Sequence, residues 1–376
     1  MRRMRWLLGL LSGVFVLLFG LDALAAVIHV KPEDSYRKIE GARAGDEVVI
    51  APGTYNYRVR LTARGTAKRP IVIRAEDPAN RPVWDLSASL VEKAPGSSSD
   101  PDRGRGCWQI DGAEHVHIHG IVFTGCRTRT HNSAGIRYHN GAKGIVVTDS
   151  IFRANDNGLT GGTEQSDITV EHCEFDRNGN LSASAGSPSH NIYVYGGTSF
   201  VLRYSYVHDP VQAENFHVRS RRSVIEYNWF ARAPRYEGDL MTDDDATRGP
   251  YEQEMLFRGN VVVQHSNPTN KTQIIALFND AGIAPLTLKL RMIANTVVVA
   301  VPQVSVVHLS NADGTRMSAE ISNNVLSGGA PALVEDASRA TVTGTNNWLL
   351  AGSSPGALVR SVFGAKPPFK DAANGD

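Results

Sequence analysis

Several features are scarce in this 376-residue sequence, and each absence narrows the choice of protein class. No window keeps the spacing of three and four that a long amphipathic helix needs, which favours a β-rich body. Lysine and arginine number 39 and aspartate and glutamate 38, with no block of like charge. Because phosphate binding requires a clustered basic surface, we expect no nucleic-acid partner. We also expect the protein to act as a monomer.

Cysteine is equally scarce, with three residues at positions 107, 126 and 173, and their spacings match no metal motif. In an exported protein Cys107 and Cys126 could form a disulfide bridge. Cys173 is expected to be a small buried residue, because free cysteine is among the most buried residue types. The cysteines therefore predict no chemistry.

Long apolar runs are confined to the first 26 residues, which have the pattern of a cleaved secretory signal peptide. Arg2, Arg3 and Arg5 give a basic start, the run from Trp6 to Leu21 is apolar, and small residues follow. We predict cleavage after Ala25 or Ala26 and no stable membrane insertion afterwards. The mature chain is then expected to be secreted or periplasmic.

A repeat runs through most of the chain. Short motifs beginning at residues 150 and 173, at 205 and 228, and at 324 and 347 are each separated by 23 residues. Longer steps at 260 and 295 fit the same coil with loop insertions. The motifs follow alternating strand segments, and many begin with asparagine, which tolerates left-handed turns and can form stacked hydrogen bonds. Strand and turn at this period predict a parallel β-helix, in which neighbouring coils bury each other's apolar faces.

Two further segments support a family resemblance. Gly45-Asp46 followed by Pro52-Gly53-Thr54-Tyr55, and Arg69-Pro70 before an alternating strand, resemble the first coils of right-handed parallel β-helix proteins of the pectate-lyase-like superfold. The sequence is most similar to secreted bacterial chondroitinase-B-like and alginate-lyase-like polysaccharide lyases. The resemblance implies an all-β protein with a single right-handed parallel β-helix (solenoid) with loop insertions over residues 27–352. Residues 353–376 are predicted to be a polar C-terminal tail or cap.

The candidate site lies on two strands, at residues 190–195 and 215–221. Side chains alternate along a strand, so Ile192, Val194, Phe216 and Val218 are expected to be buried. Ile192 and Phe216 are 24 positions apart, close to the repeat, which places Tyr193 beside His217 and Tyr195 beside Arg219. The opposite, outer face is then predicted to carry Asn191, Tyr193, Tyr195, Asn215, His217, Arg219 and Arg221.

These groups match the needs of β-elimination on a uronic acid, whose carboxylate must be neutralised while the neighbouring proton is removed. Arg219 or Arg221 would neutralise the carboxylate, and His217 and Tyr193 would act as base and acid, in either order. We predict Tyr193, His217 and Arg219 as catalytic residues. The predicted substrate-binding residues are His190, Asn191, Tyr195, Asn215, Arg221, Glu237 and Asp239. The predicted enzyme is a polysaccharide lyase, a carbon–oxygen lyase, acting on an anionic polysaccharide.

Other readings remain open. Glu237 and Asp239 would form the carboxylate pair of a glycoside hydrolase if both side chains point the same way. The same face would also suit a noncatalytic polysaccharide-binding or exopolysaccharide-assembly protein, or an ordinary ladder of surface side chains. No cofactor is predicted, although the carboxylates at residues 237, 239 and 243–245 are of the kind that calcium prefers. Insertions at residues 178–189 and 234–251 are expected to form the walls of a groove.

Overall fold

The computed structural model describes residues 24–88, 106–128, 131–163, 165–180, 189–243, 251–270, 272–278, 287–301, 304–310, 316–327, 334–335 and 340–365. The predicted signal peptide lies almost wholly outside these ranges and stays a prediction. The described helix, α1 (Arg37–Glu40), covers four residues, so within these ranges no helix is long enough to span a bilayer.

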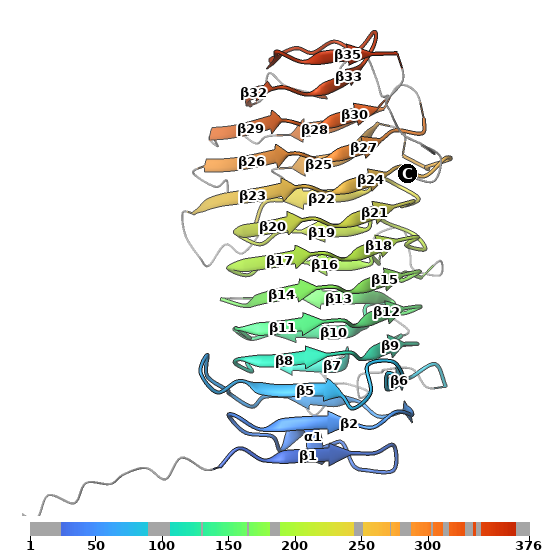
Figure 1. The fold of residues 1–376 in the computed structure, drawn as a ribbon, viewed down its shortest axis with the longest axis vertical. Coiled ribbons are helices and arrows are strands. Elements are labelled where there is room, and N and C mark those ends of the chain that lie inside the picture. Colours follow the sequence, from blue (N-terminus) through green and yellow to red (C-terminus); the bar gives the residue numbers. More distant parts are fainter. Residues whose placement is uncertain are drawn as a thin grey trace, which may run out of the picture.

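The described chain winds into a column of stacked coils, with the amino-terminal coils at one end and the carboxyl-terminal coils at the other (Figure 1). Three parallel sheets form its walls. Sheet A contains β1 (Val27–Val30), β2 (Glu47–Ile50), β5 (Ile71–Ala75), β8 (Val116–His119), β11 (Ile145–Thr148), β14 (Asp167–Glu171), β17 (Ser199–Arg203), β20 (Arg222–Glu226), β23 (Glu252–Arg258), β26 (Thr287–Ile293), β29 (Arg316–Ser322), β32 (Thr341–Thr345) and β34 (Leu358–Val359). Sheet B contains β3 (Thr54–Tyr55), β6 (Val83–Asp85), β9 (Val122–Thr124), β12 (Ile151–Arg153), β15 (Glu174–Asp176), β18 (Tyr206–His208), β21 (Trp229–Ala231), β24 (Val261–Val263), β27 (Thr296–Val298), β30 (Val325–Ser327), β33 (Trp348–Leu350) and β35 (Val362–Gly364). Sheet C contains β4 (Val59–Leu61), β7 (Gly106–Asp111), β10 (Ala134–His139), β13 (Asn157–Gly161), β16 (Ile192–Val194), β19 (Phe216–Val218), β22 (Gly238–Met241), β25 (Gln273–Phe278), β28 (Ser305–Ser310) and β31 (Val334–Glu335).

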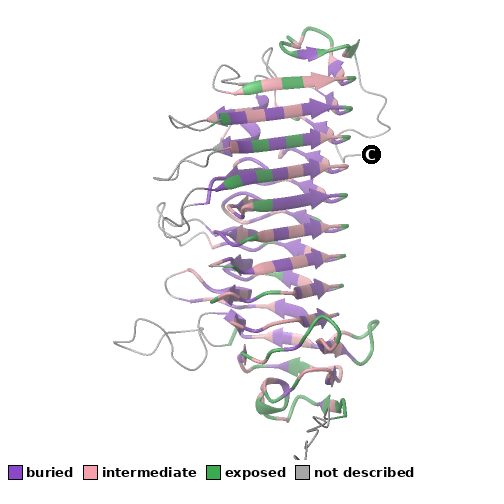
Figure 2. Ribbon diagram, turned by 90° about the vertical axis from the view of Figure 1, so that its left-hand side faces the viewer, coloured by how far each residue is buried: buried purple, intermediate pink, exposed green. Residues whose placement is uncertain are grey.

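This architecture confirms the predicted all-β fold, a right-handed parallel β-helix. Burial alternates along many of its strands, as Figure 2 shows for the strands that face the viewer. Inward side chains stack from coil to coil: the ring centroids of Phe123 and Phe152 are 5.1 Å apart, and those of Phe152 and Phe175 are 4.6 Å apart. Each fully buried phenylalanine contributes about 1.5–3 kcal/mol to the free energy of unfolding. The core is therefore shared between coils, and no coil is stable alone.

Hydrogen bonds between turn asparagines reinforce the stacking. At the turn from sheet A to sheet B, Nδ2 of Asn228 donates to Oδ1 of Asn260 at 3.1 Å, and Nδ2 of Asn260 donates to Oδ1 of Asn295 at 3.1 Å. Asn324 and Asn347 continue the ladder. The structure thus confirms the interpretation of these asparagines as structural.

The cysteines also follow expectation. Cys107, in β7, and Cys126, just after β9, form a disulfide, with their Cα atoms 5.6 Å apart. Cys173 is a buried free thiol, and burial raises its pKa to about 12. The thiol is therefore neutral at ordinary pH.

The coil extends beyond the boundary drawn from the sequence. β34 pairs with β32, and β35 pairs with β33, so ordered coil continues to Gly364 rather than ending at residue 352. This last turn could not be recognised from the sequence, because Val362 and Phe363 are both exposed and so lack the alternation of buried and exposed residues that marks the other strands. Residues 366–376 of the predicted tail lie outside the described ranges.

Gly238, in β22, lies opposite Phe216 of β19. A Cβ atom at Gly238 would lie 2.0 Å from Cζ of the buried Phe216 ring. We expect Gly238→Ala to lower the free energy of unfolding by about 1–3 kcal/mol, the usual cost of overpacking a core. Urea denaturation measures it, and adding Phe216→Leu should restore part of the loss because the smaller side chain makes room. An unchanged unfolding midpoint in the single variant would contradict this packing.

Candidate active site

The candidate site is a row of outward side chains on sheet C. Tyr193 pairs with His217, and His217 pairs with Asp239 on the next coil. Their neighbours Ile192, Phe216 and the other residues predicted to face inward are fully buried. The predicted alternation and the placement of Tyr193 beside His217 are therefore confirmed, and Asp239 joins the same row.

His217 is held from both sides of its ring. Its Nδ1 atom lies 3.2 Å from Oδ2 of Asp239, and Nε of Arg219 donates to its Nε2 atom at 3.2 Å. A guanidinium can only donate, so Nε2 accepts and the ring proton lies on Nδ1, facing the carboxyl group. Nη1 of Arg219 also donates to the carbonyl oxygen of Thr242 at 3.0 Å. The imidazole is thus oriented with a basic nitrogen toward Arg219.

Tyr193 is at the centre of a group of rings. Its ring centroid is 5.0 Å from that of His217, 5.2 Å from that of His190 and 5.6 Å from that of Tyr195. Tyr193 and His217 meet edge to face, at 82°. The arrangement brings a phenol and an imidazole together on the outer face of sheet C.

Tyr195 extends the site toward earlier coils. Its hydroxyl lies 2.6 Å from Nδ1 of His139, in β10, and Nε of Arg137 donates to Nε2 of the same ring at 2.7 Å. Gly161 of the intervening β13 pairs with both Tyr138 and Val194, so the residue between His139 and Tyr195 is Gly162, which has no side chain. The missing side chain allows a contact across two coils. Sequence reasoning identified neither Arg137 nor His139 as part of the site.

A buried ion pair lies behind the rings. Nδ1 of His190 is 3.0 Å from Oε2 of Glu214, and Nη1 of Arg235 is 2.9 Å from Oε1. Burial alone would raise the pKa of Glu214, but His190 and Arg235 outweigh it and hold that pKa below its usual value. Glu214 therefore stays ionised. Sequence reasoning missed it because it precedes the strand, where alternation says nothing.

Asp239 has the opposite electrostatic character. The Tyr236 hydroxyl donates to its Oδ2 atom at 3.1 Å, while Oδ1 has no hydrogen-bond partner in the described part of the chain. Burial, together with the negative charge of Glu214, raises the pKa of Asp239 well above its usual value. The row therefore places a carboxyl group with a raised pKa beside the imidazole of His217.

Three predicted contact residues do not belong to the outer face. Nδ2 of Asn191 donates to Oδ1 of Asn215 at 2.9 Å, and Nδ2 of Asn215 donates to Oε2 of Glu237 at 2.6 Å. All three are fully buried in a second ladder at the turn into sheet C. The prediction that Asn191 and Asn215 lie on the outer face is wrong, because the turn directs all three side chains into the column. Glu237 and Asp239 therefore cannot form the carboxylate pair of a hydrolase.

Arg221 is bound elsewhere in the site. Its Nε atom donates to Oδ2 of the buried Asp243 at 3.0 Å, and its guanidinium lies 4.6 Å from the centroid of the Tyr251 ring. These contacts lie within the second predicted groove wall, at residues 243 and 251. Residues 181–188 and 244–250 of the predicted walls, with Asp244 and Asp245, lie outside the described ranges, whereas residues 238–241 form β22 in sheet C rather than a wall.

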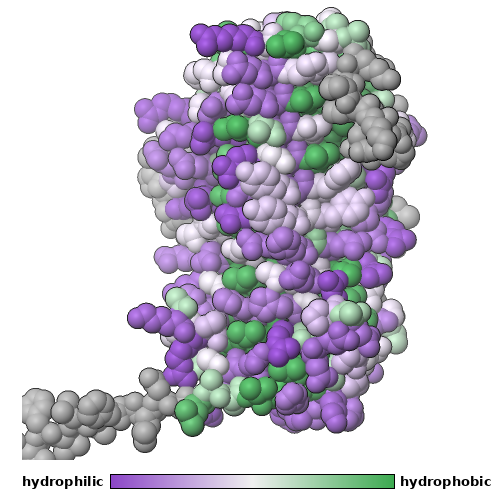
Figure 3. Space-filling model, viewed as in Figure 1, coloured by the Kyte–Doolittle hydropathy of each residue, from purple (hydrophilic) through white to green (hydrophobic). Residues whose placement is uncertain are grey.

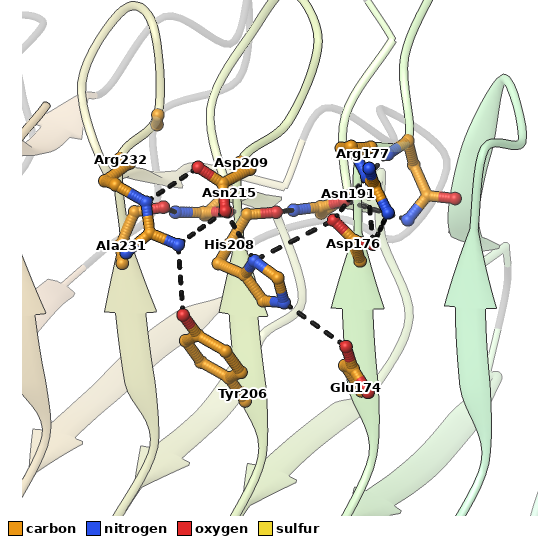
Figure 4. A network of polar contacts seen from close by, with 12 residues as sticks. Glu174, Asp176, Arg177, Asn191, Tyr206, His208, Asp209, Asn215, Ala231 and Arg232 are labelled. Atoms are coloured by element: carbon orange, nitrogen blue, oxygen red, sulfur yellow. Dashed lines mark hydrogen bonds and ion pairs between the residues drawn. The ribbon is translucent and has the colours of Figure 1, made fainter.

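The described carboxylates of that insertion bind three different groups: Glu237 binds the ladder, Asp239 binds His217 and Asp243 binds Arg221. A separate group with metal-ligand spacing occurs on sheet B, where Asp176, His208 and Asp209 converge (Figure 4). Arginines already bind these carboxylates: Arg177 binds Asp176, and Arg232 binds Asp209. Each of these aspartates therefore already has a cationic partner.

No protein-family model and no curated protein sequence matches the chain. Solved structures do match. An alginate lyase from Paenibacillus sp. str. FPU-7 is similar over 84% of this chain and 99% of its own, with a TM-score of 0.52 and 14% identity. The pectate lyase Pel9A matches over 86% of this chain and 78% of its own, with a TM-score of 0.48 and 13% identity. The lacto-N-biosidase from Eubacterium ramulus matches over 86% of this chain and 67% of its own, with a TM-score of 0.44 and 12% identity. The likeness to the alginate lyase agrees with the fold alone, a right-handed parallel β-helix.

Proposed function

We propose that this protein is an exported polysaccharide lyase that cleaves a uronate-containing glycan by β-elimination. The observation that carries the proposal is the contact of Arg219 with His217, beside Tyr193 and on the outer face of sheet C. A cation, a base and a phenol are the groups that this reaction needs in one place. The fold shared with an alginate lyase supports the choice of substrate class.

In the proposed reaction the substrate carboxylate takes over the hydrogen bonds of Arg219. This exchange frees Nε2 of His217, which removes the proton from the carbon next to the carboxylate. The electron pair of that C–H bond forms the new double bond, and the bond from the next carbon to the glycosidic oxygen breaks. Tyr193 gives its proton to the departing oxygen. Arg219 stabilises the enediolate charge, and Asp239 holds the imidazolium at Nδ1.

The remaining groups would position these three. His190 and its partner Glu214 lie behind the Tyr193 ring and would orient that ring. Tyr195, whose hydroxyl contacts His139, would orient the bound sugar chain. Arg221, bound to Asp243, would fix the loop rather than contact the carboxylate. A chelator added to the assay tests whether calcium serves as an additional cation.

The test is incubation of the purified protein with alginate, polygalacturonate and chondroitin while following the ultraviolet absorbance of new unsaturated ends. We expect absorbance to rise with at least one polymer and to stay flat with neutral glucomannan. New reducing ends without unsaturation would show hydrolysis instead. Binding of a polymer with neither product would make the protein a noncatalytic glycan-binding β-helix.

A further inference from the structure

The turn from sheet A into sheet B has a left-handed backbone conformation in coil after coil. Small or polar residues suit this conformation best, and large side chains are uncommon there. In three consecutive coils, however, the position is aromatic: His172, Tyr204 and Tyr227 have φ of 54°, 51° and 58°. The equivalent residues in other coils are Gly120, Asp149, Gly259, Ala294, Asn323 and Asn346. Large rings that persist against local backbone preference indicate a compensating use.

The three rings form an offset stack along the column. The centroids of His172 and Tyr204 are 5.1 Å apart at 19°, and those of Tyr204 and Tyr227 are 5.7 Å apart at 6°. The stack ends over Gly259, where an added Cβ would lie 2.6 Å from the Tyr227 ring. Tyr204 is 50% exposed and Tyr227 is 47% exposed. The stack therefore presents one open ring per coil.

A second aromatic column lies beside the first on the outer face of sheet B. Tyr206 is 37% exposed, and its ring centroid is 6.4 Å from that of Trp229 at 80°. We call Tyr204, Tyr206, Tyr227 and Trp229 the aromatic corner. The space-filling view shows pale side chains of intermediate hydropathy gathered about halfway up the column on this face (Figure 3).

The charges around the aromatic corner are paired. Arg232 binds Asp209 and donates to the Tyr206 hydroxyl at 3.1 Å (Figure 4). Arg258 lies 5.5 Å from the Tyr227 centroid and binds Glu226. Since each of these guanidiniums binds a carboxylate, the surface offers partly exposed rings and hydrogen-bonding groups without excess charge. A nucleic acid or an anionic membrane would need a clustered cationic surface instead.

We propose that the aromatic corner is a second glycan-binding surface, which holds a pyranose chain along the column by stacking. A pyranose has apolar C–H faces and polar hydroxyls at its rim, which match rings whose phenol and indole groups are at the wet edge. A repeating ligand suits a surface with one ring per coil, whereas a stable protein interface needs about 800 Å² on each partner. The inference relies on the proposed function only for the choice of polymers.

The test uses Tyr204→Asn/Tyr227→Asn in a His217→Ala background, so that no polymer is cut. Asparagine fits the left-handed turn, and the variant should melt no lower than its parent. Native gels cast with alginate, polygalacturonate or glucomannan report binding as retardation. We expect the parent to be retarded by at least one polymer, even at about 1 M salt, where charge interactions are screened. The double variant should bind about tenfold more weakly, a change of about 1.4 kcal/mol.

The matched control is Ala294→Asn, which introduces the same residue at the same turn position outside the corner. It should leave retardation unchanged. The inference would be overturned if the double variant and its parent were retarded equally. It would also be overturned if the variant lost binding together with a lowered melting temperature, or if the protein formed a dimer that depends on the two tyrosines. If binding depends on the two tyrosines but the wild type forms no unsaturated products, the proposed lyase activity is contradicted and the second surface is not. If the wild type forms unsaturated products but binding does not depend on the two tyrosines, only the second surface is contradicted.

Discussion

Arg219→Ala is expected to lower kcat/KM on the uronate polymer by about 10²–10³-fold, the usual cost of losing one group that stabilises transition-state charge. The loss should fall mainly on kcat, because the carboxylate gains charge only as the proton leaves. Arg219→Lys should recover part of the rate, since the charge returns without the planar fork. Initial rates of unsaturated-end formation at several polymer concentrations separate kcat from KM.

Arg203→Ala is the matched control. Its guanidinium lies on sheet A, where Nε is 2.9 Å from Oε1 of Glu226 and Nη1 is 3.5 Å from Oε1 of Glu171. Loss of such a partly exposed pair should cost about 1 kcal/mol or less and leave the kinetics unchanged. If a folded Arg219→Ala protein keeps its kcat, another cation neutralises the carboxylate. A chelator that then abolishes the remaining activity would identify that cation as a metal.

The fold could be predicted from the sequence because a repeat reports directly on stacking. The 23-residue steps and the turn asparagines each describe a contact between neighbouring coils. The repeat period alone was enough to predict which strands pair in the column. The predicted boundary was wrong at the end, where Val362 and Phe363 face solvent and no described strand pairs with the far side of β35.

The candidate site was predictable only within its strands. Period-two alternation placed Tyr193, His217 and Arg219 on the outer face, and their coordinates agree. Alternation does not extend into the turn before a strand, so Asn191 and Asn215 were assigned to the wrong face. There the side chain is free to turn inward, and the backbone carbonyls of His208 and Ala231 accept their amide hydrogens (Figure 4).

Contacts between distant residues were beyond sequence reasoning. Glu214 meets His190 across 24 positions, and Tyr195 meets His139 across 56. Both contacts depend on how insertions and a glycine set the spacing between coils, which no local pattern records. A buried charge at a turn, such as Glu214, gives no periodic signal of its own.

The second ladder has an unusual end. Its amides point the same way: Nδ2 of Asn178 donates to Asn191, Nδ2 of Asn191 to Asn215, and Nδ2 of Asn215 to Oε2 of Glu237. The amide hydrogen of Ala233 donates to Oε1 at 3.0 Å. Burial raises the pKa of Glu237 from 4.5 to about 8, although these donors act in the opposite direction. A column of amides therefore ends on a carboxyl group that is protonated at neutral pH.

This pKa predicts that the protein loses stability as the pH rises. Between pH 4.5 and about 8 the folded Glu237 holds a proton that the unfolded chain releases. The Glu237 contribution is complete below the lower value, falls through this window and is lost above the upper one, by roughly 3–5 kcal/mol in all. Glu237→Gln has no proton to lose, but its amide can satisfy only one of the two donors, which adds a cost that does not vary with pH. Urea denaturation at several pH values should show the free energy of unfolding of the wild type falling relative to that of Glu237→Gln. Asp239 and Glu214 titrate in both proteins, so their effects cancel in the difference, and a difference that stays constant from pH 5 to pH 9 would mean that Glu237 is ionised throughout.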